Sequence, residues 1–125
     1  MARILLAEDE EALRALTARA LTDTGHEVVA AVDGAEALDI VAREAGRFDL
    51  LLTDIKMPLM DGIALALSVA RDYPQIIILL MTAYADQRER ASNLDALIHD
   101  VILKPFTLAE IKAAVNDALA QSSKS

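Results

Sequence analysis

The chain has 125 residues, twelve of them Lys or Arg and twenty Asp or Glu, which gives a net charge of -8. This length fits one domain, and the negative charge disfavours nucleic acid as a direct partner, because phosphate binding requires cations that displace counterions. The absence of cysteine excludes disulfides and thiolate catalysis, and no apolar run approaches the ~18 residues of a membrane span. We therefore expect a cytoplasmic protein that uses no membrane as a partner.

The predicted elements alternate between strands and helices along the whole chain. Short runs of branched apolar residues predict strands, and apolar residues recurring at i, i+3 and i+4 predict helices. In chain order we expect a strand at 4–7, a helix at 13–21, a strand at 28–32, a helix at 37–45, a strand at 50–53, a helix at 63–70, a strand at 76–81, a helix at 85–94, a strand at 101–103 and a helix at 108–119. The helix at 85–94 is polar in its middle, so we expect it to pack lightly and to be a moving part.

This alternation is typical of βαβ units around a parallel sheet, and continuously apolar strands indicate a sheet covered on both faces. We therefore predict the α/β class, with a three-layer, doubly wound, five-stranded parallel sheet of the (βα)5, flavodoxin-like type. One domain is expected over residues 1–121, followed by a flexible C-terminal tail at 122–125.

Polar side chains are concentrated where the predicted strands end. Ligands of open parallel sheets bind beyond the carboxyl ends of the strands, and the residues found there are Glu8, Asp9, Asp54, Thr82 and Lys104. Capping of the following helix could explain an Asp or Thr taken singly. It does not explain a lysine that converges with three acids.

Three carboxylates close together repel one another and raise each other's pKa unless a cation intervenes. Oxygen ligands without His or Cys favour Mg2+ or a similar hard ion. Asp54 would then be a nucleophile beside a metal, with Lys104 as a second positive group and Thr82 as a hydrogen-bond donor. These groups are what phosphoryl transfer to a carboxylate requires.

Four segments together resemble the receiver domain of bacterial two-component response regulators. They are Glu8-Asp9, DIKMPLMDG at 54–62, MTAY at 81–84 and KPF at 104–106, and their order and spacing match over essentially the whole chain. The resemblance implies that residues 1–121 form a receiver domain, a signalling domain rather than an enzyme, although it promotes its own phosphorylation and dephosphorylation.

The resemblance also implies the role of each site residue. Asp54 would accept phosphate from a histidine kinase or histidine phosphotransferase, and Mg2+ would be held by Asp9, Asp54 and the backbone carbonyl of Lys56, with Glu8 acting largely through water.

Further residues would hold the phosphoryl group itself. Lys104 would bind the acyl phosphate, the Thr82 hydroxyl and the Ala83 amide would bind its oxygens, and the Lys104-Pro105 peptide bond would be cis.

One position departs from the family pattern. Many receivers carry an aromatic residue or histidine three positions before the last lysine, and this chain has Val101 there. We hypothesise that Tyr84, two residues after Thr82, is the mobile ring instead.

Because no effector domain is expected after residue 121, the chain resembles single-domain regulators, in particular the alphaproteobacterial CpdR group. That resemblance implies that phosphorylation state controls delivery of cell-cycle substrates to the ClpXP protease. The partner would bind the face formed by the fourth helix, fifth strand and fifth helix, and the unphosphorylated form would be the active one.

Three other functions share some of these sequence features. A receiver can act only as a phosphate shuttle in a phosphorelay. A Mg2+-dependent phosphatase or phosphotransferase with an aspartyl nucleophile commonly has a second Asp two residues later, where this chain has Lys56. A flavodoxin-like cofactor binder requires an anion-binding loop after the first strand, and Glu8 and Asp9 have the wrong charge for one.

Overall fold

The computed structural model describes residues 2–123, which form five strands and five helices in strict alternation. The strands are β1 (Arg3–Ala7), β2 (Glu27–Ala31), β3 (Leu50–Asp54), β4 (Ile77–Thr82) and β5 (Asp100–Leu103). The helices are α1 (Glu11–Asp23), α2 (Gly34–Arg43), α3 (Gly62–Asp72), α4 (Ala85–Ser92) and α5 (Leu108–Ser123). All ten predicted elements are confirmed, with boundaries that differ by a few residues.

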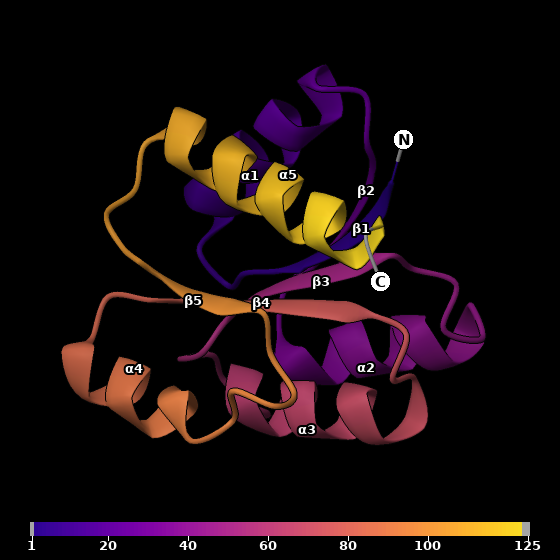
Figure 1. Cartoon of the computed structure of the whole chain (residues 1–125), viewed down its shortest axis with the longest axis vertical. Helices are drawn as coiled ribbons and strands as arrows, with labels where there is room; N and C mark the ends of the chain where they lie inside the picture. Colours follow the sequence, from indigo (N-terminus) through magenta and orange to yellow (C-terminus); the bar gives the residue numbers. More distant parts are fainter. Residues whose placement is uncertain (1, 124–125) are drawn as a thin grey trace.

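The strands form one parallel sheet in the order β2-β1-β3-β4-β5. Helices α1 and α5 cover one face, and α2, α3 and α4 lie on the other (Figure 1). This is the three-layer, doubly wound arrangement that the alternating pattern predicts. The crossover after β1 places β2 at one edge, and the chain then returns past β1 to build the other side of the sheet.

Alternate residues of the central strands enter opposite cores. Leu51 of β3 packs among side chains beneath α2 and α3, whereas its neighbours Leu50 and Leu52 pack on the side of α1 and α5. Every residue of β3 is buried, because successive side chains of a strand point to opposite faces and both faces are covered. This explains why the strand sequence is apolar without alternation.

Three helix starts, those of α2, α3 and α5, are capped by side chains of the residues just before or within their first turn. Asp33 accepts a hydrogen bond from the Glu36 N–H at the start of α2, and Asp61 accepts one from the Ala64 N–H at the start of α3. Thr107 and Glu110 bond each other's backbone N–H groups before α5, which is a capping box. Among the described residues, helices α1 and α4 have no side-chain cap, and Asp61 caps α3. The side chains at the ends of β1, β3 and β4 therefore do not cap the helices that follow.

The last helix continues through residue 123, so it includes residues 122 and 123 of the segment predicted as a tail; residues 124–125 lie outside the described part. Over the described residues, no helix combines the length and apolar character needed to cross a membrane.

Candidate functional site

The strand register brings the polar residues of distant segments to one edge of the sheet. Ala7 of β1 pairs with Thr53 of β3, so the next residues, Glu8 and Asp54, are neighbours across the two strands. On the other side, Asp54 pairs with Met81, the residue before Thr82. Thr82 in turn pairs with Leu103, and its carbonyl accepts a hydrogen bond from the Lys104 N–H at 2.8 Å.

The three acidic residues form one cluster. A carboxylate oxygen from each of Glu8, Asp9 and Asp54 lies within 4.8 Å of the other two. Glu8 is 1% exposed and Asp54 is 7% exposed, whereas Asp9 is exposed. An oxygen-only donor set of this charge suits a hard divalent ion such as Mg2+, and the exposed side at Asp9 gives such an ion a route from solvent.

Lys104 binds two members of this cluster directly. Its ammonium lies 2.7 Å from Oε1 of Glu8 and 3.2 Å from Oδ2 of Asp54. All three side chains are at most 16% exposed, so the ion pairs are protected from the screening that weakens surface pairs. Glu8 also accepts a hydrogen bond from the Glu10 N–H at 3.1 Å, which fixes its carboxylate toward Lys104.

The electrostatics of the cluster favour bound cations. Burial raises the pKa of Asp54, and the charge of Asp9 raises it further, although the charge and hydrogen bond of Lys104 oppose the rise. Burial likewise raises the pKa of Glu8, against the hydrogen bond from Lys104. The environment thus disfavours both carboxylate charges more than one lysine can offset. An additional cation would relieve the excess negative charge.

The side chain of Lys104 stays protonated and positively charged. Burial is the largest influence on its pKa and lowers it, but the hydrogen bond to Glu8 and the charge of Asp54 raise the pKa above the ordinary lysine value overall. The ammonium is therefore charged whenever the carboxylates are, and it can neutralise charge on a group attached to Asp54.

Two backbone features lie beside the cluster. The Lys104-Pro105 peptide bond is cis, as the resemblance implied. Gly62, at the start of α3, donates its N–H to the Ile55 carbonyl at 2.7 Å, and a Cβ at this position would lie 2.0 Å from the Asp54 carbonyl oxygen. Only glycine allows α3 to begin this close to the end of β3.

A cavity of about 280 Å³ opens over the cluster. Its walls include Asp9, Asp54, Lys104 and, from the two neighbouring loops, Lys56 and Tyr84. The Lys56 ammonium lies 4.9 Å from the centre of the Tyr84 ring, within the range of a cation–π contact. Tyr84 is 45% exposed, so its ring sits at the mouth of this cavity rather than in the core.

Thr82 and Ala83 follow β4 at the same edge. Thr82 is fully buried, and its hydroxyl donates to Oε1 of Gln87 at 2.7 Å and accepts from the Tyr84 N–H at 3.1 Å. Ala83 is exposed and lines the cavity. All the residues predicted for the site thus meet at this edge, but the Thr82 hydroxyl is bonded to α4.

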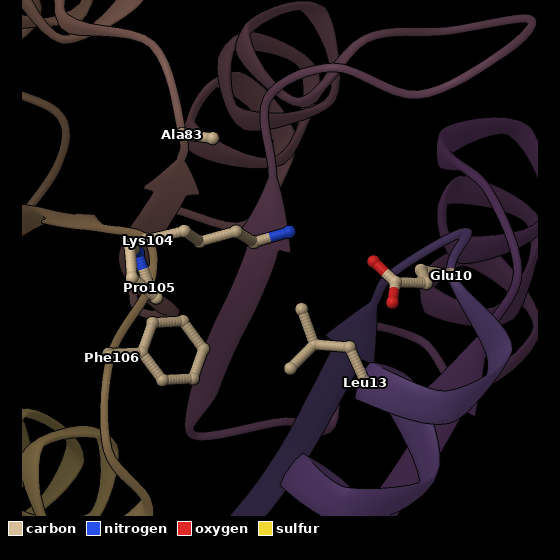
Figure 2. A pocket seen from close by; sticks show the side chains of 6 residues that line it. All are labelled: Glu10, Leu13, Ala83, Lys104, Pro105 and Phe106. Atoms are coloured by element: carbon tan, nitrogen blue, oxygen red, sulfur yellow. The ribbon is translucent and has the colours of Figure 1, made fainter.

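A second cavity, of about 270 Å³, adjoins the first. Figure 2 shows Leu13 of α1 facing Phe106, with the Lys104 side chain running along one side of this pair and its ammonium pointing toward the side where Glu10 lies. Pro105 and Ala83 complete its lining. The side of the site next to α1 is therefore mainly apolar.

Sequence reasoning missed Gln87, because a glutamine within a polar helix carries no signal for a bond to a strand end five residues earlier. It also missed the capping residues. Their signals were visible, since TLAE at 107–110 has the T-x-x-E spacing of a capping box and precedes an apolar run.

The family whose model matches this chain is described as the response regulator receiver domain, and the match covers residues 4–116. Among curated proteins, the response regulator MprA of Mycobacterium leprae is 38% identical over 117 residues, which are 94% of this chain and 50% of that protein. The chain spans about half the length of the curated relatives it matches.

Solved structures share the fold. TrrA of Thermotoga maritima, in complex with Mg2+-BeF, has a TM-score of 0.83 and 32% identity, covering 95% of this chain and all of that chain. A CheY-like receiver protein of Methanospirillum hungatei has a TM-score of 0.90 and 28% identity, covering 99% and 98% of the two chains.

Proposed function

Because this chain belongs to the response regulator receiver family, we propose that Asp54 accepts a phosphoryl group in two-component signalling. The observation that supports this most strongly is the position of Asp54 between a carboxylate cluster and the ammonium of Lys104. A buried carboxylate in such surroundings has both a nucleophilic oxygen and the positive charge that phosphoryl transfer requires.

Mg2+ is the cofactor that fits the cluster. Asp9, Asp54 and the backbone carbonyl of Lys56 would hold it, with Glu8 contributing from its buried position beside Lys104. When bound, the ion supplies positive charge next to the transferring group. TrrA, the relative solved with Mg2+-BeF, supports this assignment by analogy.

The donor would be a phosphohistidine of a histidine kinase or histidine phosphotransferase. An oxygen of Asp54 attacks the phosphorus in line, the P–N bond breaks, and the imidazole leaves with its electron pair and takes up a proton. Lys104 neutralises charge on the new acyl phosphate, while the Thr82 hydroxyl and the Ala83 amide bind its oxygens. The protein is modified once per event, so it is a phosphoacceptor rather than a turnover enzyme.

The output would be a change of protein-binding surface. Adding about -1.5 to -2 units of charge at Asp54 draws the Thr82 loop inward and shifts α4 with it. A protein partner would bind in the cytoplasm to the face formed by α4, β5 and α5. Leu103 of β5 and Leu108 of α5 are exposed. Tyr84 is the aromatic ring proposed to move. If Tyr84→Ala changed neither phosphorylation kinetics nor partner affinity, that assignment would be wrong.

We further propose that the partner belongs to a regulated proteolysis system, with ClpXP or its adaptors receiving cell-cycle substrates under control of the phosphorylation state. The polar α4 and Val101, which resemble the CpdR group, support this choice. A pull-down comparing Asp54→Asn with phosphodonor-treated protein tests it. Enrichment of ClpX in the Asp54→Asn sample is expected, and enrichment of neither ClpX nor an adaptor would contradict it.

Phosphorylation by acetyl phosphate tests the receiver function itself. With Mg2+, the intact mass should rise by one phosphoryl group in the wild type and in a control Asp39→Asn, and not in Asp54→Asn. Continuous hydrolysis of an external phosphomonoester by the wild type would instead favour the aspartyl phosphatase.

A further inference from the structure

The only proton of the Thr82 hydroxyl is already donated in the structure. A threonine hydroxyl has one proton to donate, and that proton goes to Oε1 of Gln87 at 2.7 Å. The same oxygen accepts the Tyr84 N–H at 3.1 Å. Thr82 is 0% exposed, so solvent does not reach its hydroxyl. A phosphoryl oxygen at Asp54 could gain this donor only if Gln87 lost it.

The helix that carries Gln87 has few other attachments to the sheet. Ala91 is the one residue of α4 that is fully buried, and the ion pair between Arg90 and Asp61 is exposed, at 3.4 Å. Helix α4 lies beside β5 at the end of the layer that also contains α2 and α3 (Figure 1). A single bond between its first turn and the end of β4 is therefore a substantial part of what fixes its position.

We propose that Gln87 is a positioning residue that holds the Thr82 hydroxyl toward α4 until a phosphoryl group competes for it. This inference rests on the proposed phosphorylation of Asp54. A hydrogen bond to a charged phosphoryl oxygen is stronger than one to a neutral amide, so the exchange runs toward the phosphoryl group once that group is present. The net free energy of the exchange is that of the new hydrogen bond to the phosphoryl oxygen minus that of the broken Thr82–Gln87 bond.

The exchange gives α4 a reason to move. When the Thr82 hydroxyl leaves, the Oε1 atom of Gln87 loses its partner on the sheet, and the first turn of α4 loses its bond to the end of β4. By linkage, a protein partner that prefers the released α4 must favour phosphorylation to the same extent. Position 101, which pairs with Leu80, is a valine and has no ring that could rotate. The exchange of the Thr82 hydrogen bond would therefore be what couples phosphorylation to α4.

Binding of beryllofluoride with Mg2+, an analogue of the acyl phosphate, tests the proposal. Gln87→Leu, and Gln87→Ala as a second variant, should tighten its Kd roughly two- to tenfold, as expected for loss of one neutral hydrogen bond from the unbound state. Glu89→Leu, an exposed change on the same helix, should leave the Kd at the wild-type value.

A double-mutant cycle separates positioning from a general loosening of α4. In a Thr82→Ala background the hydroxyl is absent, so Gln87→Leu should no longer tighten binding. Tightening that persists there, or an unchanged Kd for Gln87→Leu alone, would overturn the role of Gln87. Failure of the wild type itself to bind beryllofluoride would instead overturn the proposed phosphorylation site, so the two failures are distinct.

Discussion

The ammonium of Lys104 lies 2.7 Å from Oε1 of Glu8, although the two residues are 96 positions apart in the chain. Strands β1 and β5 that precede them are separated in the sheet by β3 and β4. The long lysine side chain spans this distance. Along the way it also bonds Asp54, at the end of the central strand β3. One cation thus connects both halves of the sheet at the edge where the carboxylates meet.

Lys104→Met should destabilise the protein by about 3–5 kcal/mol at neutral pH without metal, because two buried carboxylates lose their partner. The loss should shrink in mild acid, where both carboxylates can be protonated. Urea unfolding in the presence of a chelator measures both effects. Lys112→Met on α5 is the matched control, and an equal loss in the two variants would contradict this account of the ion pairs.

Glu8→Gln should stabilise the metal-free protein. Burial raises the pKa of Glu8 in the folded state, so the folded state binds its proton more tightly than the unfolded chain does. The stability contributed by that proton is complete below the unfolded pKa and is lost as the pH rises through the folded pKa.

Removing this carboxylate should therefore raise the free energy of unfolding at neutral pH by roughly 0.5–2 kcal/mol. It should also flatten the pH dependence between mildly acidic and neutral solution. A variant no more stable than the wild type at neutral pH, with the same pH dependence, would refute the assigned cause of the pKa shift.

Mg2+ should stabilise the fold by relieving the repulsion among the carboxylates of Glu8, Asp9 and Asp54. At ten times its Kd the ion adds about 1.4 kcal/mol to the free energy of unfolding, which a thermal scan with and without chelator would detect. Asp9→Asn should abolish most of this gain without unfolding the protein, since Asp9 is exposed. An equal gain in wild type and Asp9→Asn would place the bound ion elsewhere.

Gly62→Ala should disrupt the site from the backbone. Its Cβ would lie 2.0 Å from the Asp54 carbonyl oxygen and 2.9 Å from Cα of Ile55, and neither atom belongs to a side chain that can rotate away. We expect a loss of about 1–3 kcal/mol or more together with weaker Mg2+ binding. Ala64→Ser in the same helix is the control, and a Gly62→Ala protein with normal stability and normal Mg2+ affinity would contradict the close approach.

The sequence was sufficient to predict the sheet, because the cores of β3 and β4 are continuously apolar and every helix except the polar α4 has a clear 3.6-residue period. It also placed Glu8, Asp54 and Lys104 together, since parallel strands bring their carboxyl ends to one edge. The same rule does not predict which polar residue caps which helix. Asp54 and Asp61 are both acidic residues before α3, and only the loop geometry shows that Asp61 is the cap.

The state of the Thr82 hydroxyl was beyond prediction for a similar reason. Its partner Gln87 lies in a helix so polar that its inward face is not defined by hydrophobic pattern. Which polar side chain of α4 turns toward the sheet depends on how the short loop at 83–84 enters the helix, and that follows from packing rather than from residue type.

Reduction with labelled borohydride tests the central claim most directly. Borohydride converts an aspartyl phosphate to homoserine, so peptide mapping after treatment with a phosphodonor and Mg2+ identifies the phosphorylated residue. The expected result is label at position 54 alone, dependent on Mg2+ and absent from protein that was not phosphorylated. Label at another residue, or none in protein that has gained phosphate, would contradict the assignment of Asp54.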